Sequence, residues 1–469
     1  MKAPWKGVVC VMNRLRSGGE CWQKRVWLAT MLLLGAICPG LVQAQFQRLW
    51  EIRTDLSFDG EFHRDNYYAS AVSNADRTVT LYQLTSTGTL TPLWSYTEPA
   101  AYALRASPKL DVDSEAERIF LRVIWRPQRV DLWALGLDGT FRWVVHSALL
   151  PDSYYYAWLE GDGGGGVYEE VSSLVPWVTA LKWYTPSDGT LGWGYSRAGY
   201  FVTRKDPLNR LLITLPIVAN NRTVGLRFEW YIMPGNLIRV TEWRRSVDAV
   251  NLVGPLLFDA AGNFYLGVSV VSPDYSWEKY LLSISPEGQI RWLQRRPPGD
   301  IYYSPGDHSL IILGGTVHET MQQLKLVKLS ADTGEVIQSR TIYQTAREAI
   351  GAVPVALDER FLYIAVHEGH WEEHCDYEGC DDYFVLDEVI LLRVGLNGEL
   401  LAQMPFSESE NVSRIESIRG NLWLFYSSFE SGRAISCYKP LAVRADGDID
   451  GNGCVDDLDL LRLLFAFGQ

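Results

Sequence analysis

After its first 44 residues the sequence has no apolar run long enough to cross a bilayer as a helix, which takes about 20 residues. Basic residues are also too few to balance the acids. The whole chain has a formal net charge of -13, and residues 1–44 are basic, so the remainder is more acidic still. Nucleic-acid binding needs basic surface that displaces counterions. We therefore expect no nucleic-acid partner and no membrane-spanning segment after residue 44.

Residues 1–44 have the pattern of a signal peptide. Lys24 and Arg25 precede an uncharged, mostly apolar run at 26–41, and the segment ends in Val42-Gln43-Ala44, which suits a signal peptidase. The apolar run is short for a membrane span and contains Pro39. A signal anchor is the alternative. The pattern predicts a secreted protein, extracellular or at the cell surface, with the periplasm as a further possibility.

Cysteine is scarce after residue 44. That part of the chain has four of the seven cysteines, and residues 1–44 have the other three. Cys375 and Cys380 are close in sequence, and an exported protein meets oxidising conditions, so they could form a local disulfide. Two free thiols are the alternative. Cys437 and Cys454 have no assigned partner.

Residues 45–440 lack long stretches of helical periodicity and are rich in Trp, Tyr, Val and Leu, which predicts strands. A hairpin pattern recurs: an apolar strand, a turn with glycine, and a strand with tryptophan. Glycine provides the positive φ of a tight turn. The tryptophans recur at intervals of 44 to 50 residues, at Trp50, Trp94, Trp143, Trp193, Trp243 and Trp292. Two later copies have Gln338 and Ala402 at the equivalent position.

A period near 50 residues with four short strands per unit is typical of a β-propeller. We expect each tryptophan to lie on an outermost strand and to fill the space between blades. Residues 46–52 look like an outer strand without a blade, and residues 414–439 look like a blade without its outer strand. Joining the two closes the ring and gives eight blades. Seven blades, or tandem two-layer sandwiches, are the alternatives.

Two units, around Gly139 and Gly288, contain an apolar strand, an Asp-Gly or Glu-Gly turn and a following tryptophan. They resemble the repeats of quinoprotein-like (PQQ-type) β-propellers, a resemblance that implies the fold. It also raises a PQQ-dependent dehydrogenase as an alternative function. The adjacent cysteine pair often seen in alcohol-oxidising quinoproteins is absent after residue 44, which disfavours that activity.

Residues 441–469 contain the strongest chemical motif. Oxygen-bearing side chains fall at positions 1, 3, 5, 9 and 12 of the loop 448–459, with glycine at position 6, which is the spacing of an EF-hand calcium loop. Position 7 provides its backbone carbonyl, and an amphipathic leucine-rich helix is expected to follow. The predicted calcium ligands are Asp448, Asp450, Asn452, Cys454, Asp456 and Asp459.

Asp at position 12 and the Asp-Leu-Asp-Leu-Leu start of the helix make this segment resemble a dockerin type I repeat. The resemblance implies calcium binding by the matching aspartate and asparagine residues and a cohesin-like partner. Dockerins usually have two such repeats, and the sequence has one, which puts the cohesin-docking surface in doubt. A plain acidic tail is the alternative.

Two other segments are rich in functional residue types. Residues 367–384 read as a polar insertion in one loop, in which His367, His370 and His374 could bind zinc or copper. A solvated loop is the favoured interpretation. The glycine run 161–166 lacks the lysine of a phosphate loop and reads as a flexible connection. No catalytic set stands out, so the sequence favours a binding or scaffold protein whose partner is a protein or polysaccharide. An extracellular enzyme acting on carbohydrate is the alternative.

Overall fold

The structure, a computed structural model, describes residues 46–440 except for 57–58, 74, 100–102, 105–107, 127–128, 149–157, 175–176, 220–221, 233–234, 246–248, 272–275, 315–322, 346, 348, 352, 376–379, 408–409 and 429–431. The chain divides into units 1–43 and 44–469. The predicted signal peptide, calcium loop and following helix therefore lie outside the described residues.

The described residues form strands in eight antiparallel sheets, each numbered here as a blade from its innermost to its outermost strand. Blade 1 contains β2 (Glu61–His63), β3 (Asn66–Ser73), β4 (Thr78–Leu84) and β5 (Leu90–Thr97). Blade 2 contains β6 (Ala103–Leu104) and β7 (Lys109–Asp113), both beside β8 (Arg118–Arg126), then β9 (Arg129–Gly136) and β10 (Phe141–Ala148). Blade 3 contains β11 (Leu159–Gly161), β12 (Val167–Leu174), β13 (Trp177–Tyr184) and β14 (Leu191–Ala198). Blade 4 contains β15 (Val202–Lys205), β16 (Leu211–Ala219), β17 (Arg222–Ile232) and β18 (Asn236–Arg244).

The remaining blades repeat the same order. Blade 5 contains β19 (Ala249–Phe258), β20 (Phe264–Val271), β21 (Trp277–Ile284) and β22 (Ile290–Arg295). Blade 6 contains β23 (Asp300–Ser304), β24 (Ser309–Gly314), β25 (Gln323–Ser330) and β26 (Val336–Gln344). Blade 7 contains β27 (Ala349–Ile350) and β28 (Val355–Leu357), both beside β29 (Phe361–Cys375), then β30 (Cys380–Gly395) and β31 (Leu400–Ser407). Blade 8 contains β32 (Asn411–Ile418), β33 (Asn421–Ser428), β34 (Gly432–Pro440) and β1 (Phe46–Arg53).

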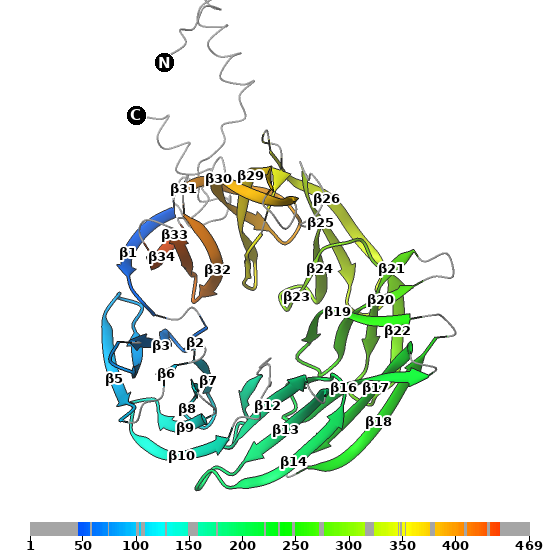
Figure 1. The fold of residues 1–469 in the computed structure, drawn as a ribbon. Coiled ribbons are helices and arrows are strands. Elements are labelled where there is room, and N and C mark those ends of the chain that lie inside the picture. The colour runs from blue at the N-terminus through cyan, green and yellow to red at the C-terminus, as the bar shows by residue number, and fades with distance from the viewer. Residues whose placement is uncertain are drawn as a thin grey trace, which may run out of the picture. The chain divides into compact units, whose positions relative to one another are not determined.

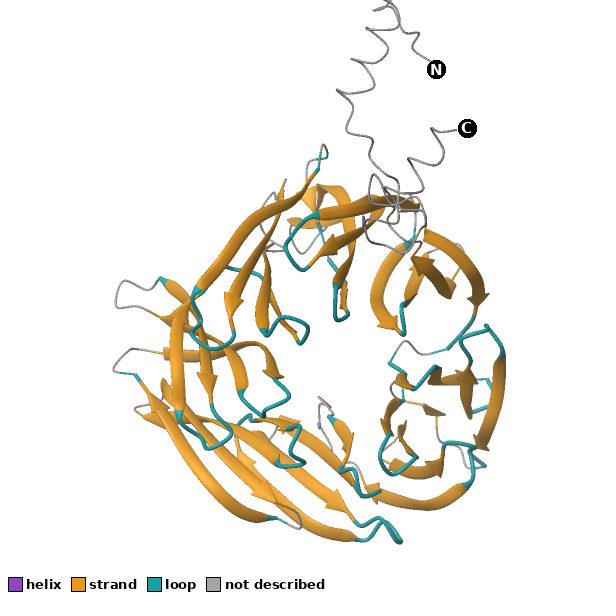
Figure 2. Cartoon of the chain, turned by 180° about the vertical axis from the view of Figure 1, so that it is seen from behind, coloured by secondary structure: helices purple, strands orange, loops and turns teal. Residues whose placement is uncertain are grey.

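The eight sheets follow one another around a ring, with their first strands toward its centre (Figure 1), and the same ring is seen from behind in Figure 2. The described residues between 46 and 440 therefore form an eight-bladed β-propeller. This confirms the all-β prediction and decides for eight blades over seven. The described residues include no helix long and apolar enough to cross a membrane.

The ring is closed by the first described strand. Strand β1 pairs antiparallel with β34 and becomes the outer strand of blade 8, with Trp50 opposite Cys437. The predicted union of residues 46–52 with 414–439 is thus confirmed. Closure removes two open sheet edges that would otherwise be free to pair with other chains.

The recurring tryptophan and glycine meet across neighbouring blades. Trp50, Trp143 and Trp292 belong to apolar clusters between successive blades, and their indole Nε1 atoms donate to backbone carbonyls of the next blade. A Cβ atom added to Gly88 would lie 2.8 Å from Trp50, and one added to Gly189 would lie 2.6 Å from Trp143. The glycine therefore has two roles. It permits a positive φ in the turn, and it leaves room for the indole of the preceding blade.

Gly88→Ala tests this double role. Gly88 has φ of 83°, and Gly420 has φ of 77° with nothing within 4 Å of an added Cβ. Both alanine variants should lose about 1–2 kcal/mol to the left-handed conformation. Gly88→Ala should lose a further 1 kcal/mol or more, roughly the cost of overpacking, because Trp50 must move. Denaturant unfolding of the two variants measures the difference, and equal losses would contradict the packing role.

The predicted insertion at residues 367–384 is present, but the prediction that it is a loop is wrong. Strands β29 and β30 continue through it as one long hairpin, while the corresponding strands of blade 8 have eight and nine residues. We call residues 367–375 and 380–384 the arm. Its sequence is mostly charged and polar, and its aromatic residues Trp371 and Phe384 lie opposite each other on the two strands, so the polarity concealed the strands.

Candidate functional site

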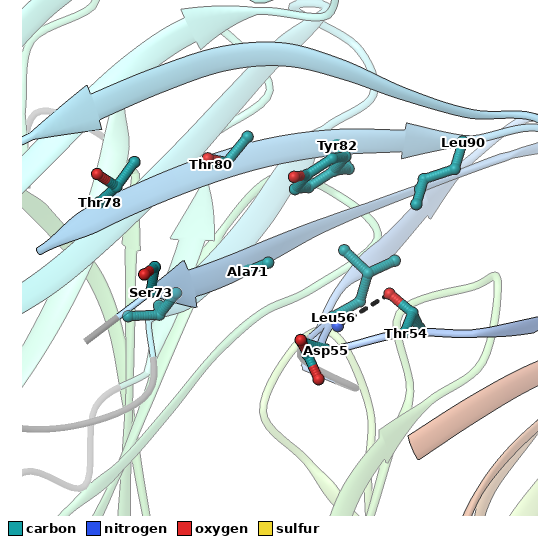
Figure 3. Close-up of a pocket in the computed structure, with 10 residues that line it drawn as sticks. Thr54, Asp55, Leu56, Ala71, Ser73, Thr78, Thr80, Tyr82 and Leu90 are labelled. Atoms are coloured by element: carbon teal, nitrogen blue, oxygen red, sulfur yellow. Dashed lines mark hydrogen bonds between the residues drawn. The ribbon is translucent and has the colours of Figure 1, made fainter. Parts of the chain in front are cut away.

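A pocket of about 380 Å³ lies beside blade 1, next to the segment that follows the ring-closing strand β1 (Figure 3). On one side is the segment Thr54–Leu56, which carries the chain from β1 to blade 1. Facing it are side chains of the central strands β3 and β4, with Leu90 of β5 at one end. The lining residues are Thr54, Asp55, Leu56, Ala71, Val72, Ser73, Thr78, Thr80, Tyr82 and Leu90. We call this the seam pocket.

Strand alternation explains the wall that blade 1 presents. Side chains two residues apart in a strand share a face, so Thr78, Thr80 and Tyr82 of β4 lie together. Tyr82 packs beside the apolar cluster between blades 8 and 1. Small side chains such as Ala71 continue the same face, and because they do not fill the space, a cavity is left.

The opposite wall is anchored to blade 8 by hydrogen bonds. The Thr54 N–H donates to the Arg433 carbonyl at 3.0 Å, and the Thr54 Oγ1 accepts from the Leu56 N–H at 3.2 Å. The Leu56 side chain is buried in the core between the blades, while Asp55 is exposed. The pocket thus has one carboxylate at its entrance and a fixed backbone behind it.

The chemistry of the seam pocket suits binding. Its hydroxyl groups pair with neighbours: Thr78 with Thr97 at 2.8 Å, and Thr80 with Ser95 at 3.1 Å. Among the lining residues that the structure describes there is no histidine, lysine or cysteine, and Asp55 is the one carboxylate. A tyrosine ring beside several hydroxyls offers an apolar surface and short-range hydrogen-bonding partners together.

A second group of polar residues lies on the innermost strands of blades 1 to 3. Burial raises the pKa of Asp111 on β7 to about 6, and the hydrogen bond from the Gly161 backbone partly offsets this rise. Burial also raises the pKa of Glu160 on β11 to about 7, with a smaller contribution from Asp111. Glu61 on β2 has a pKa raised to about 7 by desolvation, although its side chain is the most exposed of the three and is better screened by solvent. We call these three residues the carboxylate arc.

Two members of the carboxylate arc hold neighbouring blades together. The Asp111 Oδ2 accepts from the Gly161 N–H of blade 3 at 2.7 Å, and Glu160 accepts from the Lys205 N–H of blade 4. The Lys205 Nζ in turn donates to the Gly161 carbonyl at 2.9 Å. Carboxyl groups with raised pKa values are candidates for acid–base chemistry. The hydrogen bonds of Asp111 and Glu160 also give these two carboxyl groups a structural role, because they link neighbouring blades.

The glycine run 161–166 is not the flexible connection that the sequence predicts. It forms the turn from β11 to β12, and Asp162 accepts from the N–H groups of Gly164 and Gly166 at 2.7 and 2.9 Å. Asp113 of blade 2 accepts from two more glycine N–H groups of the same turn. The glycines are required because a Cβ on Gly161 would lie 2.5 Å from Asp113.

The Asp162 cap belongs to a recurring feature that the sequence reasoning missed. The first residue after the inner strand is also an aspartate in other blades, and it accepts from backbone N–H groups of the turn to the second strand. These residues are Asp206, Asp259 and Asp358. An aspartate recurring ahead of the second strand in blades 3, 4, 5 and 7 was the available signal.

The predicted metal-binding residues of the arm do not converge. His367 and His370 are three positions apart on β29 and so lie on opposite faces. Burial lowers the pKa of His367 to about 4, whereas His370 lies between Glu372 and Asp387, which raise its pKa. The side chain of His374 is outside the described residues, and no group of three or more metal-ligating side chains occurs among those described. The predicted calcium ligands 448–459 also lie outside them.

No protein-family model matches the chain, and no curated protein matches it. Similar solved structures include the crystal structure of the eukaryotic initiation factor, with 11% identity, coverage of 84% of this chain and 85% of that chain, and a TM-score of 0.47. The β-propeller domain of the Trilobed protease from Pyrococcus furiosus has 10% identity, coverage of 86% and 98%, and a TM-score of 0.40. A structure from a study of two prolyl endopeptidases has 10% identity and a TM-score of 0.45; the match covers 87% of this chain and 60% of that one. At these identities and scores, what those proteins do has no bearing on this chain.

Proposed function

We propose that this protein is an exported binding or scaffold protein. In this proposal the propeller recognises a hydroxyl-rich ligand, such as a segment of polysaccharide, in the seam pocket, and the dockerin-like tail attaches the protein to a surface or an assembly through calcium. The observation that carries the proposal is the seam pocket itself, a cavity lined by hydroxyl groups beside a tyrosine ring.

The ligand class follows from the lining. A sugar ring has an apolar face and hydroxyls at its edge, so it matches an aromatic ring beside hydrogen-bonding side chains. Asp55 is the only charged residue among the described residues that line the pocket, so an anionic ligand is disfavoured by repulsion. A protein partner that inserts a loop into the pocket is the competing outcome.

Tyr82→Ala should weaken ligand binding at least tenfold, because it removes the aromatic wall. Asp55→Asn should leave binding of neutral glycans within about twofold, since the loss of one exposed charge changes little. The measurement is a glycan-array screen followed by calorimetric titration of the best ligand. Glu287→Ala, an exposed residue of blade 5, is the control. Glycan affinity that is unchanged in Tyr82→Ala would place the binding site elsewhere.

The calcium tail yields a separate prediction. Without the ion, the aspartates of the 448–459 loop repel one another, and calcium replaces that repulsion by coordination. A single loop has no paired loop to share its core, so the affinity should fall in the weak extracellular range of roughly 0.1 to 1 mM. Asp448→Ala and Asp459→Ala should each weaken binding sharply. Cys454→Ser should have little effect, because position 7 provides only its carbonyl.

Calcium titration of the whole protein, followed by heat and helicity, measures this prediction. Retained calcium binding in both aspartate variants would refute the assignment. The two proposals are independent, because the seam pocket and the tail are tested by different ligands and different variants.

The carboxylate arc supports a second candidate function, an extracellular enzyme acting on carbohydrate. Glycoside hydrolysis uses two carboxyl groups, one of them with a raised pKa, and Asp111 and Glu160 have raised pKa values on neighbouring inner strands. The binding proposal is preferred because both groups are already engaged by backbone N–H groups of the next blade.

A further inference from the structure

The arm has a fixed cross-strand register up to its tip. Glu372 lies opposite Tyr383, and Trp371 lies opposite Phe384. The Tyr383 hydroxyl donates to the Glu372 Oε2 at 2.5 Å, and the rings of Trp371 and Phe384 meet edge to face with centroids 5.5 Å apart. Such pairs are the units that stabilise antiparallel strands.

A bulge near the base of the arm determines which residues of β29 lie opposite which residues of β30. The register shifts between Glu368 and Gly369, where β30 has one extra residue, Asp387. A Cβ on Gly369 would lie 1.9 Å from the Val385 carbonyl oxygen, so the two strands are in close contact there. A slip by one residue would move every pair of the arm to the wrong face.

This register places Cys375 directly opposite Cys380 as the last pair of the hairpin. Opposite residues of an antiparallel pair have Cα atoms about 4.5 to 5.5 Å apart, and disulfides join Cα atoms roughly 4.4 to 6.8 Å apart. The paired register therefore gives the backbone a spacing that suits a disulfide. Only four residues, 376–379, separate the two cysteines in sequence.

We propose that Cys375 and Cys380 form a disulfide across the tip of the arm. The two thiols are oxidised by exchange with an external disulfide, either of a thiol–disulfide oxidoreductase or of oxidised glutathione. One S–S bond forms between the two cysteines, the S–S bond of the oxidant breaks, and the two protons and two electrons pass to the oxidant's sulfurs as thiols. The crosslink fixes the end of a hairpin that extends beyond its blade.

Other thiols are poorer partners for this pair. Cys437 lies fully buried in the core between blades 8 and 1, where burial raises its pKa to about 12. A thiol that stays protonated and has no access to solvent neither attacks nor is attacked readily. Cys454 is outside the described residues and serves as the competing outcome of the test.

The test uses the full chain exported by its own leader into an oxidising compartment and digested without reductant by a protease that cuts after glutamate. Cleavage at Glu378 separates the two cysteines, so a disulfide keeps the flanking peptides joined until reductant is added, and mass spectrometry reads the pair directly. We expect maleimide to modify neither cysteine before reduction and both after it.

Variants give the matched controls. Cys375→Ser should leave Cys380 reactive toward maleimide, while Cys454→Ser should leave the pair protected as in the parent. Complete maleimide modification of Cys375 and Cys380 before reduction would overturn the proposal. So would a linked peptide that joins either of them to Cys454.

Discussion

Replacing Trp423 by alanine should destabilise the propeller by about 3 to 5 kcal/mol, the usual loss for a fully buried tryptophan. Trp423 of β33 is 1% exposed and lies in the core between blades 8 and 1. Its ring meets Trp50 at 4.8 Å and Phe62 at 5.0 Å between centroids. The change removes packing from the seam at which the first strand closes the ring.

Trp277→Ala is the matched control, because Trp277 is 55% exposed at the start of β21. Surface changes of this kind usually alter stability by no more than about 0.5 kcal/mol. Urea unfolding followed by circular dichroism compares the two variants, since both lose one tryptophan. Equal shifts of the unfolding midpoint would contradict the importance of the seam.

Replacing Glu170 by glutamine should stabilise the protein at pH 8 by about 2 to 3 kcal/mol, the equivalent of a shift of roughly two pKa units. Glu170 of β12 is 5% exposed, and burial raises its pKa from 4.5 to about 7. The Thr203 hydroxyl donates to its Oε2 at 2.5 Å and opposes that shift. The neutral amide of glutamine avoids the burial of a charge and keeps an oxygen for this hydrogen bond.

The sign of the pH dependence follows from linkage. Between pH 4.5 and 7 the native protein holds a proton on Glu170 that the unfolded chain has lost, so stability falls as the pH rises through this window. The advantage of Glu170→Gln should therefore vanish near pH 4 and be complete above pH 7. His367 acts in the opposite direction, because its folded pKa of about 4 lies below its ordinary value of 6.5.

Thermal or urea unfolding of parent and Glu170→Gln at pH 4, 6 and 8 measures this dependence. Glu287→Gln, at an exposed position, is the control. A difference between parent and Glu170→Gln that does not change with pH would show that the glutamine acts through packing and not through charge.

The sequence predicts the fold well because the repeat in the sequence arises from packing contacts between neighbouring blades. Trp143 and Trp193 each lie against a glycine in a turn of the next blade, so their spacing in the sequence reflects the length of one blade. Closure of the ring was predictable because the segment around Trp50 has the pattern of an outer strand but is not preceded by the other strands of a blade. The arm was predicted as a loop because charged residues outnumber its aromatic residues, and such a composition is typical of loops.

The candidate site was beyond sequence reasoning for a different reason. The seam pocket joins Thr54–Leu56 to side chains of β3 and β4 that are small or hydroxylated, and nothing in their local pattern marks them as a wall. The carboxylate arc likewise depends on which blades are neighbours. Residues such as Asp111 and Glu160 are about 50 positions apart, and their contacts appear only once the ring is formed.

The most direct test of the binding proposal measures binding and turnover on the same sample. The mature protein is incubated with its best polysaccharide ligand, and bound protein and newly formed reducing ends are followed together. We predict saturable binding that Tyr82→Ala weakens, with no reducing ends above the background of a heat-denatured sample. Sustained release of reducing ends that is abolished by Glu160→Gln would contradict the proposal and establish the protein as an enzyme.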